Sequence, residues 1–154
     1  MWQQYQRYKA LNPPARKLFR AAVAVFIAIR ASLRFRGFRK TQQWLQRRLQ
    51  VQAARSAPSA DSNPIALTCR MVKAGGRYGL IQPTCLEESL ALWYFLRQGG
   101  VSSQLRIGVR KLGSKFEAHA WIEYQGQAIN ESKTLHPHYA AFDGEFSEMP
   151  GEPL

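Results

Sequence analysis

Apolar side chains recur at helical spacing in the first third of the chain. From Asn12-Pro13 to about Phe35, an apolar residue returns every three or four positions, and arginines fall between them. Asparagine can cap the free N–H groups of a helix start, and proline costs little in the first turn. We therefore predict an amphipathic helix over residues 13–35, with an apolar face made of Leu18, Ala22, Val25, Phe26, Ile29 and Leu33.

Gly37 interrupts this pattern, and a second helical pattern follows to about residue 55. Phe38, Thr41, Leu45 and Leu49 fall on one face of this helix, with basic residues around the rest. Two helices in succession predict a helical hairpin. Residues 56–64 (SAPSADSNP) are small, polar or proline, which is typical of a linker. The predicted organisation is a basic helical segment over 1–55, a linker over 56–64 and a second domain over 65–154.

The second domain begins with helical patterns. Residues 65–75 predict a short helix that Gly75-Gly76 ends. In Thr84-Cys85-Leu86-Glu87 a threonine stands three residues before a glutamate at the head of an apolar run, which is the capping-box pattern. We predict a helix from there to about Gln98, apolar nearly all round and therefore buried, and ended by Gly99-Gly100.

Strand patterns follow this central helix. Residues 104–111, 118–124 and, more briefly, 127–132 favour strands, and the tail from Thr134 onward is expected to be irregular. The predicted fold class is α+β: a buried helix with a cysteine at its N-terminus packs on an antiparallel sheet, and a basic helical segment precedes both.

The charge is unevenly distributed along the chain. There are 22 Lys and Arg against 10 Asp and Glu, for a net charge of +12. Residues 1–55 hold thirteen of the basic residues and no acid, so the rest of the chain is close to neutral. The basic segment could bind an anionic membrane surface, an acidic partner or nucleic acid. Nucleic acid is disfavoured, because the segment has no recognised reading motif and its aromatic residues lie at helix-core spacing.

The longest apolar stretch and the two cysteines indicate a cytoplasmic protein. Residues 21–29 are nine apolar positions, whereas a spanning helix needs roughly 20. No cleavage site of small residues closes that stretch, so we expect no signal peptide. Two cysteines are too few for a fold built on disulfides. We expect a cytoplasmic location, with association to a membrane through the N-terminal helices as an option.

Cys85 and His119 are the candidate catalytic residues. A cysteine in the first turn of a helix lies where unpaired N–H groups and the helix dipole favour a thiolate. His119 stands in a predicted strand between two alanines and could act as the base. The Cys85 N–H and, more weakly, the Gln82 side chain could stabilise an oxyanion. Cys69 lies among apolar residues and is interpreted as part of the core.

The third catalytic residue depends on the hairpin that follows Tyr124. With a three-residue loop ending at Gly126, His119 lies directly opposite Glu131, and their β-carbons are about 5 Å apart. With a two-residue loop, His119 faces Ser132 and Glu131 turns to the other face. Metal binding is not expected, since CxxC and HxxxH spacings are lacking and His136-Pro137-His138 is a poor substitute. We expect no cofactor.

Six stretches form a spaced set: Cys85-Leu86, Ser89–Leu92, Leu96-Arg97, Gly99–Val101, Leu105–Arg110 and Ala118–Glu123. This set, with Gly126, resembles the leader peptidases of lasso-peptide biosynthesis, which are transglutaminase-like cysteine proteases. The resemblance covers about residues 65–135 and, more loosely, the basic helical N-terminus. It implies a transglutaminase- or papain-like core and a peptidase that removes the leader from a ribosomally made precursor, which frees the core α-amine for a separate ATP-dependent cyclase.

The resemblance also implies roles and partners. Cys85 and His119 match the family's Cys and His, whereas Glu131 stands where the family carries Asp. Glu131 is one methylene longer but can still orient an imidazole, and Asp143 is a more distant alternative. Because the chain has little room for a fused recognition domain, the expected partners are the precursor's leader, a discrete leader-recognition protein and the cyclase.

Two alternatives stay open at this point. The same triad could carry acyl transfer to an amine, as in transglutaminases or arylamine acetyltransferases, because hydrolysis and transfer share the acyl-enzyme. The other alternative is a protein without enzymatic activity, whose basic segment binds a membrane or nucleic acid.

Overall fold

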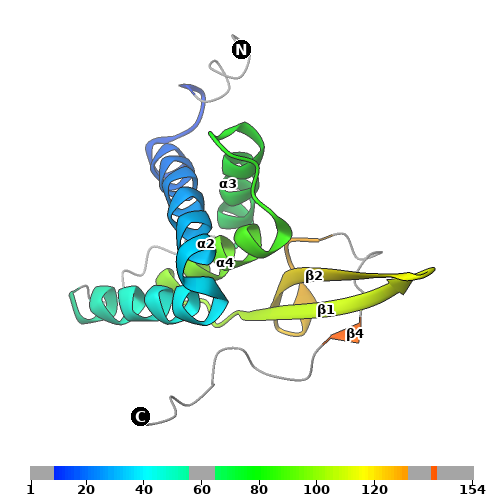
Figure 1. Cartoon of the computed structure of the whole chain (residues 1–154). Coiled ribbons are helices and arrows are strands. Elements are labelled where there is room, and N and C mark those ends of the chain that lie inside the picture. Colours follow the sequence, from blue (N-terminus) through cyan, green and yellow to red (C-terminus); the bar gives the residue numbers. More distant parts are fainter. Residues whose placement is uncertain (1–8, 56–64, 132–139, 142–154) are drawn as a thin grey trace, which may run out of the picture.

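The computed structural model describes residues 9–55, 65–131 and 140–141. In these residues, helices lie on one side and a small antiparallel sheet on the other, with its longest hairpin extending away from the helices (Figure 1). The predicted α+β fold class is confirmed. The linker expected at 56–64 lies outside the described residues, so that boundary stays a prediction.

Helix α2 (Pro13–Arg55) bends at Gly37, where φ is 75° and ψ is 177°. Its start is capped as predicted, because Asn12 Oδ1 accepts a hydrogen bond of 3.1 Å from Ala15 N. The prediction of a helical hairpin was wrong. The two halves of α2 meet at Gly37 without a loop and point in different directions (Figure 1). Glycine adopts this positive φ without a steric cost. The buried Thr41 hydroxyl reinforces the bend by donating to the Gly37 carbonyl oxygen over 2.8 Å.

Helix α3 (Ile65–Tyr78) continues through Gly75-Gly76, which were expected to end it. Both glycines are buried where other segments approach closely. A β-carbon on Gly75 would lie 3.1 Å from the Ala22 β-carbon of α2, and one on Gly76 would lie 2.8 Å from Pro83. These glycines therefore permit close packing and do not break the helix.

Helix α4 (Cys85–Gln98) begins and ends where the sequence predicts. Thr84 and Glu87 form the reciprocal capping box, and Gly99 is the C-cap. The helix is buried from Ser89 to Leu96. It lies at the centre of one apolar core with residues from α2, α3 and the sheet, which include Ala22, Phe26, Ile29, Leu45, Val72, Leu105, Ala120 and Ile122.

The sheet has the strand order β3-β2-β1-β4, with all pairs antiparallel. Its strands are β1 (Gln104–Leu112), β2 (Lys115–Tyr124), β3 (Gln127–Ala128) and β4 (Ala140–Ala141). Strand β2 thus begins three residues earlier than predicted, and β3 ends four residues earlier. The tail was expected to be irregular, but Ala140–Ala141 pair with β1 at Gly108 and Val109.

Candidate active site

Cys85 is the first residue of α4, and its side chain is exposed. The capping box fixes this position, because Thr84 and Glu87 satisfy each other's N–H groups on either side of the cysteine. The thiol therefore stands at an ordered helix N-terminus that solvent can reach. This placement is the one that the sequence predicts.

Ser89 fastens this helix to strand β2. Its hydroxyl donates a hydrogen bond of 3.0 Å to the carbonyl oxygen of Ala120, and Ser89 is fully buried. Residues four apart lie on the same side of a helix, so Cys85 is one turn from this contact. Ala120 directly follows His119. The Ser89–Ala120 bond therefore brings the start of α4 toward the part of β2 that carries the histidine.

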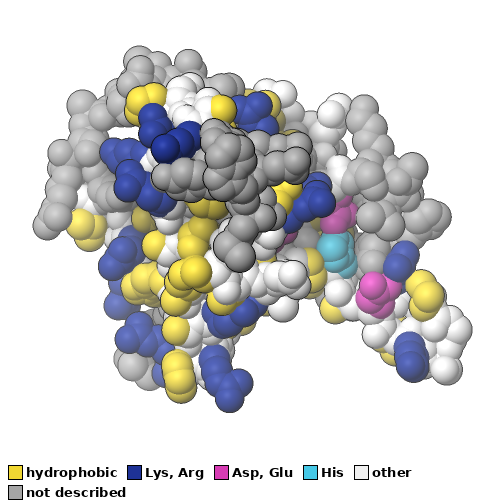
Figure 2. All heavy atoms as spheres, turned by 90° about the horizontal axis from the view of Figure 1, so that it is seen from above, with side chains coloured by type: hydrophobic (Ala, Val, Ile, Leu, Met, Phe, Trp, Pro, Cys, Tyr) yellow, Lys and Arg dark blue, Asp and Glu magenta, His cyan; other side chains and the backbone are white. Residues whose placement is uncertain are grey.

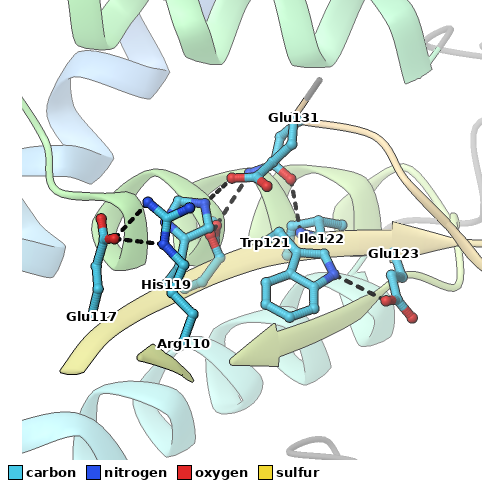
Figure 3. A network of polar contacts seen from close by, with 10 residues as sticks. Arg110, Glu117, His119, Trp121, Ile122, Glu123 and Glu131 are labelled. Carbon is cyan, nitrogen blue, oxygen red and sulfur yellow. Dashed lines mark hydrogen bonds and ion pairs between the residues drawn. The ribbon is translucent and has the colours of Figure 1, made fainter. Parts of the chain in front are cut away.

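His119 and Glu131 point toward each other, and His119 Nε2 contacts Glu131 Oε1 (Figure 3). The Glu131 side chain is only 7% exposed, whereas that of His119 is 22% exposed. The imidazole also stacks on Trp121, with ring centroids 6.4 Å apart and planes inclined by 18°. Carboxylate and indole thus hold the ring from two sides. Among the described residues, no hydrogen bond joins the Cys85 thiol to His119.

The hairpin that leads to Glu131 differs from the prediction. Its loop has two residues, because Glu123 pairs with Ala128 and Tyr124 with Gln127. Gln125 and Gly126 both have positive φ, at 50° and 74°, which is the pattern of a type I′ turn in a two-residue hairpin loop. In a continued strand this register would turn Glu131 to the opposite face. The register persists for one residue beyond β3, because Ile129 N donates a hydrogen bond of 2.9 Å to the Ile122 carbonyl oxygen. The chain leaves the register at Asn130, before it reaches Glu131.

Asn130 redirects the chain, although no motif or periodic pattern in the sequence marks this residue. Its Oδ1 accepts a hydrogen bond of 2.8 Å from Ile122 N, in place of a strand carbonyl. Its Nδ2 donates to the Ser89 hydroxyl over 3.2 Å. Asn130 thus joins β2 to α4 and brings its neighbour Glu131 back to His119. A buried serine one turn after Cys85 and an asparagine beside Glu131 were the only local signals for this network.

A cleft of about 490 Å³ lies beside Glu131, between α3, α4 and the segment after β3. Glu88 projects into it from α4, and burial raises the pKa of this carboxyl, to which the nearby Glu131 carboxylate adds. One oxygen of Glu131, Oε2, is buried and has no hydrogen-bond partner. The cleft is lined by Cys69, Arg70, Val72, Lys73, Glu88, Leu92, Ile129, Asn130 and Glu131.

The other residues considered for the site are Cys69, Gln82 and three residues of the C-terminal tail. Cys69 is half-buried against the core, and burial raises the pKa of its thiol, so it lacks the setting of a nucleophile. Gln82 is exposed, and its role as an oxyanion donor stays a prediction. His136, His138 and Asp143 lie outside the described residues.

A family model described as "Transglut_core3: Transglutaminase-like superfamily" matches residues 25–142. It includes most of α2 as well as all of the residues that form the candidate site. Searches of curated proteins and of solved structures gave no match. Within the described residues, none of the helices combines the length and the apolar character needed to cross a bilayer.

Proposed function

The chain belongs to the transglutaminase-like superfamily, and on this premise we propose that it is a cysteine peptidase that removes the leader from a ribosomally made lasso-peptide precursor. The superfamily includes both cysteine peptidases and acyltransferases. The contact between His119 and Glu131, beside a helix that begins at Cys85, is the observation that carries the proposal. The motif set around Cys85, Ile107–Arg110 and Ala118–Trp121 supports the choice of leader peptides as substrates.

In the first step, Cys85 Sγ attacks the carbonyl carbon of the scissile peptide bond. His119 accepts the thiol proton and passes it to the departing amine as the C–N bond breaks. Because Nε2 contacts Glu131, Nδ1 is the ring atom that exchanges this proton. The core peptide leaves with a free α-amine, and the leader remains as a thioester on Cys85.

In the second step, water attacks the thioester while His119 takes one of its protons. The carbon–sulfur bond breaks, the thiol regains its proton from His119, and the leader departs with a free carboxylate. Glu131 orients the ring and stabilises the imidazolium that forms in each step. The Cys85 N–H, with Gln82 as a weaker donor, would stabilise the oxyanion.

The test is leader removal by the full chain with a Cys85→Ala substitution. The proposed substrate is a lasso-peptide precursor, to be sought together with a leader-recognition protein among the neighbouring genes, and mass spectrometry identifies the products. The Cys85→Ala protein should fold and bind the precursor but release no free leader. The Cys69→Ala protein should cleave the precursor at the normal rate. Normal processing by Cys85→Ala would overturn the proposal.

The product masses also distinguish hydrolysis from acyl transfer. A leader with a free carboxylate indicates hydrolysis, whereas a leader joined to an added amine indicates transfer. If only the amine adduct forms, the protein is an acyltransferase and the peptidase proposal is wrong.

Glu131→Gln tests the third member of the triad. The amide cannot stabilise an imidazolium as a carboxylate does, so we expect turnover to fall by about 100-fold or more while the fold persists. Glu117→Gln is the matched control, because Glu117 lies on the same strand as His119, pairs with Arg110 and is half exposed. Equal turnover in wild type and Glu131→Gln would show that another group orients His119.

The basic surface of α2 supports docking of a recognition protein. Helix α2 carries eleven Lys and Arg and no acid, and Lys and Arg side chains gather over the helical part of the molecule (Figure 2). Exposed apolar side chains lie among them, including Phe35 at 82% exposure. Co-sedimentation with anionic and neutral vesicles distinguishes the alternatives: binding to anionic vesicles alone would favour a membrane surface instead.

A further inference from the structure

One of the eleven basic residues of α2 contacts the start of α4 and the segment that precedes Cys85. Arg30 Nη2 donates a hydrogen bond of 2.5 Å to the Gln82 carbonyl oxygen. Its Nε and Nη2 also donate to the two carboxylate oxygens of Glu87, each over 2.8 Å. The guanidinium therefore binds both α4, at Glu87, and the segment before it, at Gln82. Arg30 itself belongs to a helix more than fifty residues earlier in the sequence.

The residues held in this way lie on both sides of Cys85. Glu87 Oε2, which accepts from Arg30, also accepts a hydrogen bond of 2.7 Å from Thr84 N. The Thr84 hydroxyl accepts in return from Glu87 N over 3.3 Å. A single carboxylate thus joins the capping box to Arg30, and the capping box encloses the cysteine.

The burial of Glu87 makes this contact more than a surface ion pair. Glu87 is 5% exposed, and its hydrogen bond with Arg30 is the main reason that the pKa of the carboxyl is lowered. The Arg30 side chain is 39% exposed, so solvent screens part of the attraction. Removal of the guanidinium would still leave the Glu87 carboxylate without its charge partner and weaken the start of α4.

We propose that Arg30 is a positioning residue for Cys85: the clamp from Arg30 to Gln82 and Glu87 fixes the start of α4, so that the thiol meets the acyl carbon in an attacking geometry. The inference rests on the proposed function, since it assumes that Cys85 is the nucleophile. The inference also gives α2 a second role, because this helix would position Cys85 as well as carry the basic surface. Arg30 itself touches no reacting atom.

The experiment uses the full chain with Cys69→Ser, so that Cys85 is the single thiol, and 4-nitrophenyl acetate as the acyl donor. The thiolate attacks the acetyl carbon, the carbon–oxygen bond breaks, and 4-nitrophenolate leaves and is measured by absorbance. Arg30→Gln should slow acylation at saturating ester by about tenfold or more, since small misplacements of a nucleophile are costly. The ester concentration that gives the half-maximal rate should change little in Arg30→Gln. Arg77→Gln, at an exposed arginine of α3, should stay within about twofold of the parent.

Two further variants separate positioning from stability. Arg30→Lys keeps the charge but cannot form the two-pronged contact, so it should fold and recover only part of the rate. Glu87→Gln should slow acylation as Arg30→Gln does, and the double variant should be no slower than either single one, because both act through one contact. Circular dichroism and urea unfolding confirm that each sample is folded at assay conditions.

A folded Arg30→Gln protein that acylates at the parent rate would overturn the proposal. If Arg30→Gln does not fold, a folded Arg30→Lys protein at the full parent rate overturns it equally. Failure of the proposed function has a different signature, namely nitrophenolate release that persists in Cys85→Ala. The two hypotheses can therefore fail independently.

Discussion

Asn130 donates a hydrogen bond to Ser89, and this bond ties the segment that carries Glu131 to the helix that begins with Cys85. The donor comes from the chain after β3 and the acceptor from the buried face of α4. Because Asn130 also replaces a strand carbonyl at Ile122 N, a single side chain joins three elements. The candidate base and its orienting acid therefore depend on a residue that has no chemical role of its own.

Replacing Asn130 should affect both stability and turnover. Asn130→Ala leaves the Ile122 N–H without its acceptor, which should lower the free energy of unfolding by about 1–3 kcal/mol in urea titrations. Turnover should fall as well, because Glu131 is no longer directed to His119. Asn130→Asp keeps an acceptor for Ile122 N and loses the donor to Ser89, so it should retain more stability than Asn130→Ala. Unchanged stability in both variants would contradict this role.

The Arg30–Glu87 contact predicts a loss of stability in acid. The hydrogen bond from Arg30 is the main cause that lowers the pKa of Glu87. A carboxyl with a lowered pKa in the folded state adds stability above its unfolded pKa of about 4.3, and that stability is lost as the pH falls through the folded pKa. The urea midpoint of unfolding should therefore be higher for wild type than for Glu87→Gln at neutral pH. The difference between the two midpoints should become smaller below about pH 4.3. A gap that is constant with pH would refute the linkage, and Glu117→Gln is the control.

Glu88 should show the opposite pH dependence. Burial is the main cause that raises its pKa, so the folded state binds its proton more tightly than the unfolded state does. Its contribution to stability is therefore full below about pH 4.3 and falls as the pH rises through the folded pKa. Glu88→Gln should be more stable than wild type at neutral pH and show no gain in acid. Urea titrations at both pH values measure this, and a gain that is equal at both would show that burial of the charge is not the cause.

The two cysteines should differ in reactivity. Cys85 is exposed, whereas Cys69 is half-buried and burial raises the pKa of its thiol. Iodoacetamide at neutral pH should label Cys85 first, by about tenfold or more in rate, because alkylation needs an accessible thiolate. Peptide mapping by mass spectrometry measures the two sites separately. Comparable rates in the native chain, or unequal rates after denaturation in urea, would be inconsistent with this explanation.

Local patterns predicted the helices at the site well. The Thr84–Glu87 capping box and the glycines after Gln98 fix both ends of α4 through interactions within a few residues, and the structure has both. The apolar faces around Phe26 and Leu45 are also buried as predicted. These features follow from sequence because their causes are close together along the chain.

Glycines were harder to interpret, because one residue type serves opposite purposes. Gly37 takes a positive φ and bends α2, whereas Gly75 stays helical and admits Ala22 at close range. The residues on either side of a glycine do not reveal whether a segment distant in sequence will pack against it. The predicted hairpin at Gly37 and the predicted break at Gly75-Gly76 were both wrong for this reason.

The sequence by itself determined which residues could perform the chemistry and where two of them stand: Cys85 at a capped helix start and His119 on a strand. It also indicated the pairing of His119 with Glu131, but through a three-residue loop that does not exist. Only the tertiary structure decided how that pair forms, through the Asn130 bonds that release the chain from its strand register, and how Arg30 reaches the start of α4. Both depend on contacts between residues distant in sequence, and such contacts leave no periodic or local trace in the chain.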